Sequence, residues 1–207
     1  MSRERVITDI KQQQRNSGRF SVYVDDAYAF SLSESALIAS GLRAGQVLTA
    51  EEEEEHHKGS EEDKIYALAV NYVGVRPRSI AEMRGYLKRK GIDQEMAAEA
   101  ISKLEQNGLL SDKSFAISWI SNRQIQRPRS KRRLGQELQA KGLSRDDIDS
   151  ALGDIDTDTE LENLVQLIEK KRRSSQYQAT DKLIGYLVRQ GYSYEQTKKA
   201  LARLDDQ

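Results

Sequence analysis

The residues with the clearest potential for chemistry are arginines and lysines in short runs about fifty residues apart. Arg-Pro-Arg-Ser occupies residues 76–79 and, 51 positions later, residues 127–130, and Lys-Lys-Arg-Arg occupies residues 170–173. A guanidinium group donates two parallel hydrogen bonds and therefore suits phosphates and carboxylates. The runs predict a surface that binds an anionic partner. The candidate residues are Arg76, Arg78, Arg127, Arg129, Lys131, Arg132, Arg133, Lys170, Lys171, Arg172 and Arg173.

A structural role is the alternative for the same side chains. Some of these arginines could cap helix ends or pair with Glu82, Glu137 or Asp181 instead of binding a partner. The distribution of charge bears on this choice, because a formal net charge of zero hides strong segregation. Residues 76–145 hold 16 Lys or Arg against 7 Asp or Glu, whereas residues 146–162 hold 8 acidic residues and no basic one. Such blocks favour a polyanionic or mixed-charge partner, although solvated helix faces explain part of the pattern.

Residues for catalysis or metal binding form no comparable pattern. The sequence has no cysteine and only two histidines, and it has no glycine-rich phosphate loop or serine nucleophile motif. His56 and His57 are neighbours whose side chains would point apart on a helix, so a linker or helix start explains them better than a metal site. We therefore expect no enzyme activity, no catalytic residue, no metal ligand and no cofactor.

No segment resembles a targeting or membrane-spanning sequence. The first 30 residues lack an apolar signal core. No stretch approaches the roughly 20 consecutive apolar residues of a membrane span. The sequence predicts a cytoplasmic protein that has no membrane partner and is a monomer.

A repeated motif would position the basic runs. In its first copy, Leu87 is followed by Gly91, an apolar residue and then Asp93. The glycine suits the left-handed conformation that closes a helix, and the aspartate suits the N-cap of the next one. The three copies are residues 87–93, 138–144 and 187–193.

Each copy is followed by apolar positions with the i, i+3, i+4, i+7 spacing that an amphipathic helix buries. The three stripes are Ala97, Ala100, Ile101 and Leu104; Ile148, Ala151, Leu152 and Ile155; and Thr197, Ala200, Leu201 and Leu204. Since three short helices bury little area alone, neighbouring repeats should stack on one another. Stacking with a small rotation would align the basic runs, expected between the first and second helices of each repeat, as one stripe.

The amino-terminal fifty residues predict a different structure. Residues 19–24 and 27–32 alternate apolar and polar side chains around Asp25-Asp26, which indicates a β-hairpin. Val6, Ile7 and Ile10 are candidates for a third strand, and residues 33–40 for a short helix that ends at Gly41.

The expected fold is therefore mainly α: tandem three-helix repeats in an elongated, curved array, preceded by a small three-stranded α+β module. The module should occupy residues 1–50, and a charged linker or helix start residues 51–62. The repeats should occupy residues 63–110, 111–158 and 159–207.

The helix–glycine–helix pattern also resembles a DNA-binding helix-turn-helix. In that motif the later helix reads the major groove. The exposed faces of the third helices are acidic in repeats one and two, which disfavours base readout; only repeat three, with Lys198, Lys199 and Arg203, tolerates it. Trp119 could stack on a base, but it occupies a repeated apolar position and is better explained by core packing. Tyr192 matches apolar residues of the other repeats and should also be buried.

Several stretches between residues 65 and 204 together resemble the RecX family. Their order and spacing carry the resemblance more than any single one does. They are Arg76-Pro77-Arg78-Ser79, Lys90-Gly91-Ile92, Asn107-Gly108-Leu109-Leu110-Ser111-Asp112 with Phe115-Ala116, and Lys141-Gly142-Leu143. Repeat three departs from the pattern, with Gln176-Tyr177-Gln178-Ala179 at the corresponding place.

The resemblance implies a non-enzymatic regulator of the RecA recombinase. Family members are tandem three-helix repeats that lodge in the helical groove of the RecA filament on DNA. There they inhibit strand exchange, ATP hydrolysis and co-protease activity, and they can also contact single- or double-stranded DNA directly. Two other functions fit the residues: a sequence-independent DNA-binding protein that uses the basic stripe, and a helical scaffold for a different protein.

Overall fold

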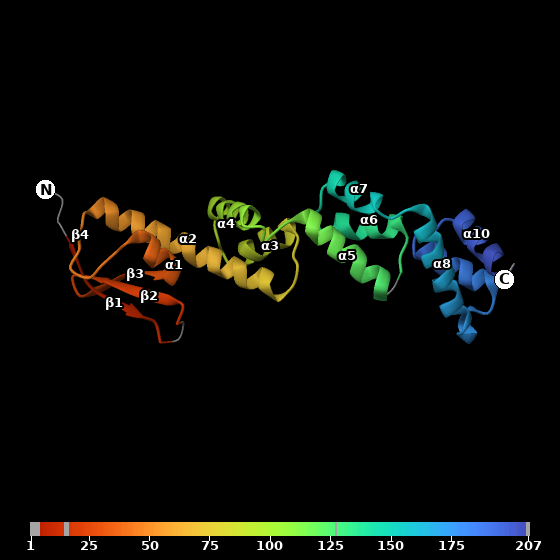
Figure 1. Cartoon of the computed structure of the whole chain (residues 1–207), viewed down its shortest axis with the longest axis horizontal. Helices are drawn as coiled ribbons and strands as arrows, with labels where there is room; N and C mark the ends of the chain where they lie inside the picture. The colour runs from red at the N-terminus through yellow and green to blue at the C-terminus, as the bar shows by residue number, and fades with distance from the viewer. Residues whose placement is uncertain (1–4, 15–16, 127, 206–207) are drawn as a thin grey trace. The chain divides into compact units, whose positions relative to one another are not determined.

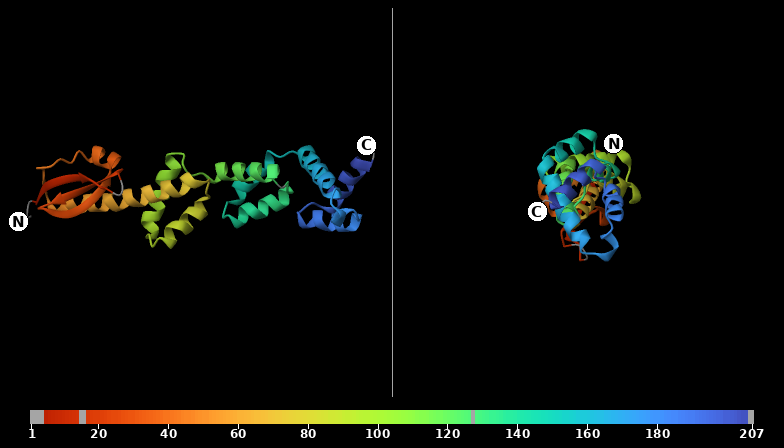
Figure 2. Two further views of the ribbon diagram at one scale, coloured as in Figure 1. Left: turned by 90° about the horizontal axis from the view of Figure 1, so that it is seen from below. Right: turned by 90° about the vertical axis from the view of Figure 1, so that its right-hand side faces the viewer.

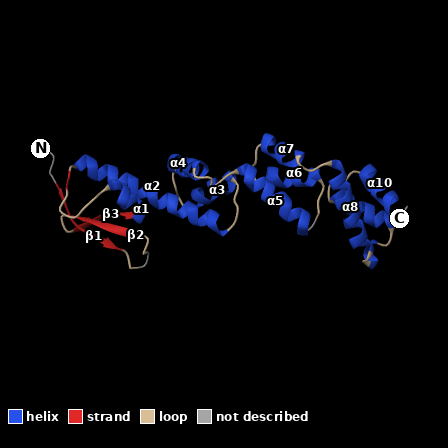
Figure 3. Cartoon of the chain, viewed as in Figure 1, coloured by secondary structure: helices blue, strands red, loops and turns tan. Residues whose placement is uncertain are grey.

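The structure, a computed structural model, describes residues 5–14, 17–126 and 128–205 (Figure 1). The chain forms two compact units. The first comprises the chain up to Val75 together with residues 86–109, and the second comprises residues 76–85 together with the chain from Leu110 onward. Strands are confined to the amino-terminal part of the described chain, and helices make up most of the rest (Figure 3). In the described ranges, no helix is both long and apolar enough to cross a bilayer.

The first unit begins with a curled antiparallel sheet. Its strands are β1 (Arg5–Gln12), β2 (Arg19–Val24), β3 (Ala27–Ser33) and β4 (Val47–Leu48), in the spatial order β3-β2-β1-β4. The predicted hairpin is confirmed, since β2 and β3 pair across Asp25-Asp26, whose φ angles are 48° and 63°. Two successive residues with positive φ are typical of the type I′ turn, which matches the twist of the flanking strands.

The sheet has four strands, not the three expected. The additional strand, β4, pairs Val47 with Val6 and Leu48 with Arg5. Two residues are too short for an alternating pattern, so the sequence carries no signal for this strand. The predicted helix is α1 (Glu34–Ser40); the Ser33 hydroxyl caps it and Gly41, with φ of 65°, ends it.

Helix α2 (Ala50–Val75) follows the sheet and is also the first helix of repeat one. Residues 51–62 lie inside it, so the helix-start alternative describes them and the linker does not. The first half of α2 runs along the sheet (Figure 2). Polar contacts join the two: the Ser60 hydroxyl donates to the Ser31 carbonyl at 2.6 Å, and the largely buried Arg19 and Asp63 form an ion pair at 3.0 Å.

Repeat one consists of α2, α3 (Ile80–Arg89) and α4 (Gln94–Gln106). Helix α4 packs on α2 and buries all four residues of its predicted stripe. Gly91 has φ of 76°, and the Asp93 carboxylate accepts the Glu95 N–H, as the motif predicts for a helix end and a helix start.

Repeats two and three belong to the second unit and have the same plan. Repeat two consists of α5 (Asp112–Gln126), α6 (Lys131–Ala140) and α7 (Arg145–Gly153). Repeat three consists of α8 (Thr157–Arg172), the short 3-10 turn η1 (Ser175–Tyr177), α9 (Thr180–Arg189) and α10 (Tyr194–Asp205).

Each of these two repeats has its own apolar core. Gly142 and Gly191 have φ of 84° and 93°, and Ser144 and Ser193 cap the helices that follow. Tyr192 is 2% exposed, so its predicted burial is confirmed. The tandem three-helix repeats are thus confirmed, while the curvature of the array stays a prediction.

Candidate binding surface

Two of the three basic runs lie beside junctions between successive repeats, and both junctions use the same side-chain chemistry. At the first, the Ser79 hydroxyl accepts the Glu82 N–H and donates to the Lys141 carbonyl oxygen at 2.7 Å. At the second, 51 residues later, the Ser130 hydroxyl accepts the Arg133 N–H and donates to the Gln190 carbonyl oxygen at 3.1 Å. Each serine therefore caps its own helix and holds the turn that closes the middle helix of the next repeat.

A carboxylate adds a second contact at each junction. The Ile80 N–H donates to Asp112 at 2.8 Å, and the Lys131 N–H donates to Glu160 at 2.8 Å. Both carboxylates lie at or near the start of the first helix of the next repeat. Burial raises the pKa of Asp112, although the hydrogen bond from the Ile80 N–H acts to lower it. In repeat three, Ala179 occupies the position that corresponds to the junction serine, and it makes no side-chain cap hydrogen bond. The Arg-x-x-Ser segments are therefore joining elements of the fold.

Two candidate arginines beside these junctions, Arg76 and Arg129, form ion pairs with carboxylates of the chain. The two terminal nitrogens of Arg76 each donate to Glu82 at 3.1 Å, and Glu82 also accepts from Lys141 at 2.8 Å. Arg78 is partly buried.

Glu137 is the centre of the second cluster. It accepts hydrogen bonds from Arg123 at 3.0 Å, from Arg129, and from the Trp119 indole at 3.0 Å, and it lies 3.8 Å from Arg133. The pairing alternative considered for the basic runs is therefore correct for Glu82 and Glu137. These arginines have a structural role whether or not a partner also contacts them.

The remaining candidates differ in position and exposure. Lys131, Arg132 and Arg133 form the first turn of α6, and Lys170, Lys171 and Arg172 the last turn of α8, so these residues do not lie between the helices as expected. Arg132, Lys170 and Arg173 are exposed. Lys171 lies 4.6 Å from the Tyr186 ring centroid and Arg172 pairs with Asp205 at 3.3 Å. Arg127 lies outside the described residues.

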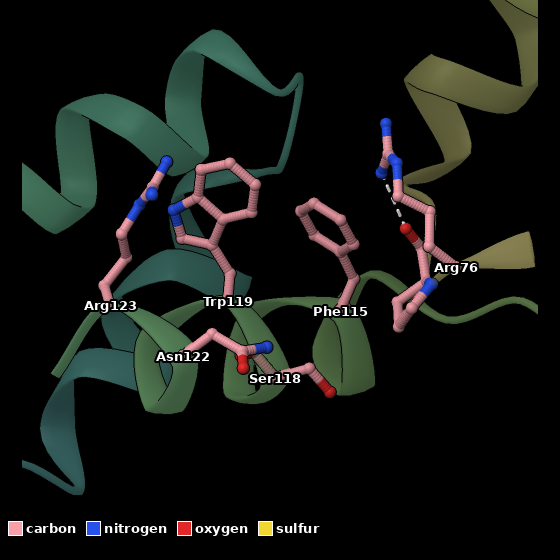
Figure 4. A pocket seen from close by; sticks show the side chains of 7 residues that line it. Arg76, Phe115, Ser118, Trp119, Asn122 and Arg123 are labelled. Carbon is pink, nitrogen blue, oxygen red and sulfur yellow. Dashed lines mark hydrogen bonds between the residues drawn. The ribbon is translucent and has the colours of Figure 1, made fainter. Parts of the chain in front are cut away.

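Sequence reasoning missed a hollow of about 230 Å³ between the Arg76-Pro77 segment and α5 (Figure 4). Trp119 lines it, together with Phe115 and Arg123. The expectation for Trp119 was core packing, and the ring does pack against the core of repeat two, but it is only partly buried. The sequence carried one signal that Trp119 is more than a core residue: the corresponding residue of repeat three is Ile168, an aliphatic side chain.

The ion pairs of Glu82 predict a pH dependence of stability. Burial raises the pKa of Glu82, but the hydrogen bonds and charges of Arg76 and Lys141 outweigh it and lower the pKa to about 2. The unfolded value is about 4.3. A folded pKa below the unfolded one contributes stability above about pH 5, and this stability is lost as the pH falls toward the folded pKa.

We therefore expect Glu82→Gln to be less stable than the wild type by about 1 kcal/mol at neutral pH, a modest value because Arg76 and Lys141 are partly exposed. The difference should shrink toward zero between pH 5 and pH 2 in urea unfolding. Glutamine retains the capping interaction, so the comparison isolates the charge. A difference that stays constant with pH, or an equal effect of Glu105→Gln at an exposed position, would contradict the assignment.

The fold and the junctions define a class: a helical-repeat protein whose three-helix units are joined in series behind an amino-terminal β-rich module. Family models match most of the chain. Residues 5–49 match the regulatory protein RecX N-terminal domain, and residues 66–104, 111–152 and 158–201 match the first, second and third three-helix domains of RecX. The chain belongs to the RecX family, whose members are regulatory proteins and not enzymes.

Individual relatives agree with this assignment. The chain is 31% identical to the regulatory protein RecX of Halalkalibacterium halodurans over 205 residues, which is 95% of this chain and 77% of the relative. It is 30% identical to the regulatory protein RecX of Bacillus cytotoxicus over 210 residues, which is 98% of this chain and 78% of the relative.

Two solved structures share the fold at 24% sequence identity. A crystal structure of regulatory protein RecX aligns with a TM-score of 0.73 over 94% of this chain and 99% of that one. The crystal structure of RecX from Lactobacillus salivarius aligns with a TM-score of 0.63 over 71% of this chain and 98% of that one.

Proposed function

We propose that this protein regulates the RecA recombinase by binding in the helical groove of the RecA–DNA filament. Bound there, it suppresses ATP hydrolysis, strand exchange and co-protease activity. The observation that carries the proposal is membership of the RecX family over nearly the whole chain, including all three helical domains.

The distribution of charge supports a partner that presents both protein and phosphate. The acidic block of α7 and the start of α8 is exposed at Asp146, Asp149 and Asp158. These carboxylates would be repelled by naked DNA, whereas basic side chains of a partner protein would attract them. The exposed cations Arg132, Lys170 and Arg173 suit phosphates or partner carboxylates.

The held arginines also favour this proposal over the stand-alone DNA-binding alternative. Arg76 and Arg129 already pair with carboxylates of the chain, so they offer less net positive charge to a phosphate backbone than the sequence suggests. A pre-organised guanidinium can still donate from its outer edge to a group in a fixed position. Such a surface is less suited to a partner held mainly by charge, which is what the stand-alone DNA-binding alternative requires.

The test is the ATPase of RecA assembled on single-stranded DNA. The protein should suppress ATP hydrolysis at equal or lower molar amounts and should sediment with the filament. Full ATPase at excess protein, without co-sedimentation, would reject the proposal. Binding to naked DNA as firm as to the filament, with a steep loss of affinity as salt rises, would favour the DNA-binding alternative.

A charge-matched pair of variants locates the surface. The triple substitution Arg132→Ala, Lys170→Ala and Arg173→Ala removes exposed cations of the predicted stripe, and we expect at least tenfold more of this variant to be needed for half-maximal inhibition. The control removes three exposed cations elsewhere: Lys58, Lys64 and Lys88. Equal effects of the two variants would show that net charge, and not the stripe, determines binding.

A further inference from the structure

The hollow beside the first junction has walls that differ from the packed interior of the repeats. It is lined by Arg76, Pro77, Phe115, Ser118, Trp119, Asn122 and Arg123. Figure 4 shows the two arginines at opposite ends of a row, with the rings of Trp119 and Phe115 between them and the polar side chains of Asn122 and Ser118 along one side. The volume, about 230 Å³, is below the range of about 300–1,000 Å³ that is usual for drug-sized ligands.

Core packing does not require aromatic side chains at this place. A shift of 49 residues relates α5 to α8, and it places Leu164 at the position of Phe115 and Ile168 at that of Trp119. Both aliphatic residues are fully buried in repeat three. Repeat two instead carries two rings 5.7 Å apart, with Trp119 partly exposed. Phe115 is buried in the core of repeat two as Leu164 is in repeat three, so it is the partly exposed Trp119 ring that calls for a further explanation.

The arginines of the hollow are held in position. Arg123 lies 4.4 Å from the Trp119 ring centroid and donates its Nε–H to Glu137 at 3.0 Å. Arg76 is fixed by its two bonds to Glu82. Asn122 donates its amide N–H to the Ser118 carbonyl at 2.9 Å, which leaves its side-chain oxygen to act as an acceptor.

We propose that this hollow binds one base of single-stranded DNA. The partly exposed Trp119 ring and the Arg123 guanidinium plane provide a stacking surface that tolerates any base, because every base has a π face. The Asn122 oxygen and the Ser118 hydroxyl can hydrogen-bond to the edge of the base, and the arginines at the two ends lie where the flanking phosphates would pass. In a duplex the bases are paired and stacked, so only an unpaired strand can present a base to the hollow.

This site is separate from the regulation of RecA proposed above, since it concerns direct contact of this chain with DNA. A protein side chain is the main competing occupant. Two observations favour the base: the flanking cations are in excess over Glu82 and Glu137, and the polar groups at one side suit a ring that carries donors and acceptors on its edge.

Trp119 is the single tryptophan of the chain, so its fluorescence reports on the hollow without a label. Titration of the full-length protein with a 15-nucleotide oligothymidine, without RecA, should quench the emission saturably. A duplex of the same length should cause little quenching. Oligonucleotide binding without quenching, quenching that is equal with the duplex, or no binding at low salt would each overturn the proposal.

Substitutions separate stacking from charge. The double variant Phe115→Leu and Trp119→Ile carries the side chains of repeat three, and it should bind a labelled oligothymidine about tenfold more weakly, as expected for one lost stacking contact of about 1–3 kcal/mol. The slope of log K against log salt should be unchanged, because no phosphate contact is lost. Tyr28→Leu, which removes a ring exposed on β3, is the control. Unchanged affinity of the double variant would overturn the proposal.

A second pair of variants remains informative if the double variant fails to fold. Asn122→Glu and Ser121→Glu each add one negative charge at an exposed position of α5, but only residue 122 lines the hollow. The first should weaken binding at least fivefold more than the second, and equal effects would overturn the proposal. The RecA ATPase assay is independent of these measurements, so failure of either proposal can be recognised separately.

Discussion

Replacing Gly191 by alanine should lower the free energy of unfolding by about 3 kcal/mol. A non-glycine residue in the left-handed region costs about 1–2 kcal/mol, and Gly191 has φ of 93°. The added methyl would also overlap the Ser130 hydroxyl and lie 3.1 Å from the Arg133 Cβ. Overpacking typically costs another 1–3 kcal/mol, and here it also displaces the serine that joins repeats two and three.

Gly142 should behave in the same way. Its φ is 84°, and a methyl group there would overlap the Ala81 side chain at the first junction. Gly91 is the internal control, because it occupies the same place in the motif with φ of 76°, but no atom of the described residues lies close enough to touch the added methyl. Gly91→Ala should therefore show only the backbone cost of about 1–2 kcal/mol.

Urea unfolding followed by circular dichroism should rank the variants, and amide hydrogen exchange should show where each one opens. Exchange should accelerate at the start of α6 in Gly191→Ala and at the start of α3 in Gly142→Ala. Equal destabilisation by all three substitutions would mean that the glycines serve only their own turns and that the junctions contribute no close packing.

Replacing Glu137 by glutamine should destabilise the protein by about 2–4 kcal/mol. Glu137 is 14% exposed, and the Arg129 that it holds is 18% exposed, with a buried Nε that has no hydrogen-bond partner among the described residues. Removing one member of a largely buried ion pair leaves the other charge uncompensated, which typically costs about 3–5 kcal/mol. The partial exposure of Arg123 and Arg133 reduces the expected value.

Arg129, which loses its carboxylate partner in Glu137→Gln, provides the decisive control. Adding Arg129→Met to Glu137→Gln should recover part of the lost stability, since it removes the unpaired charge and retains an apolar side chain of similar length. Asp149→Asn removes a carboxylate paired with Arg145 on the exposed surface of α7 and should change the unfolding free energy by less than about 0.5 kcal/mol. If the double variant were less stable than Glu137→Gln, the unpaired guanidinium would not be the cause of the loss.

The ion pairs of the basic runs limit which residues can be used to test their binding function. Arg76 and Arg129 each stabilise the chain, so alanine substitutions there would lower stability together with any binding. The exposed cations Arg132, Lys170 and Arg173 are better probes of the proposed surface, because the described structure assigns them no ion pair.

The sequence by itself determined the features that depend on residues close together along the chain. The helix repeat follows from apolar spacings of three, four and seven residues, and the hairpin follows from alternation around Asp25-Asp26. The closing glycines and capping serines, such as Gly191 and Ser193, act within one or two turns. Family membership follows from the order of these local motifs.

Only the tertiary structure decided the features that depend on contacts between distant segments. The two-residue strand β4 exists because it pairs with β1, more than forty residues earlier. Glu82 meets Lys141 across 59 residues, so the choice between a structural and a binding arginine at position 76 could not be made from the sequence. Gly91 and Gly191 look alike in the motif and differ only in what packs against them. The hollow beside Trp119 likewise forms only where two repeats meet, because its walls come from different repeats.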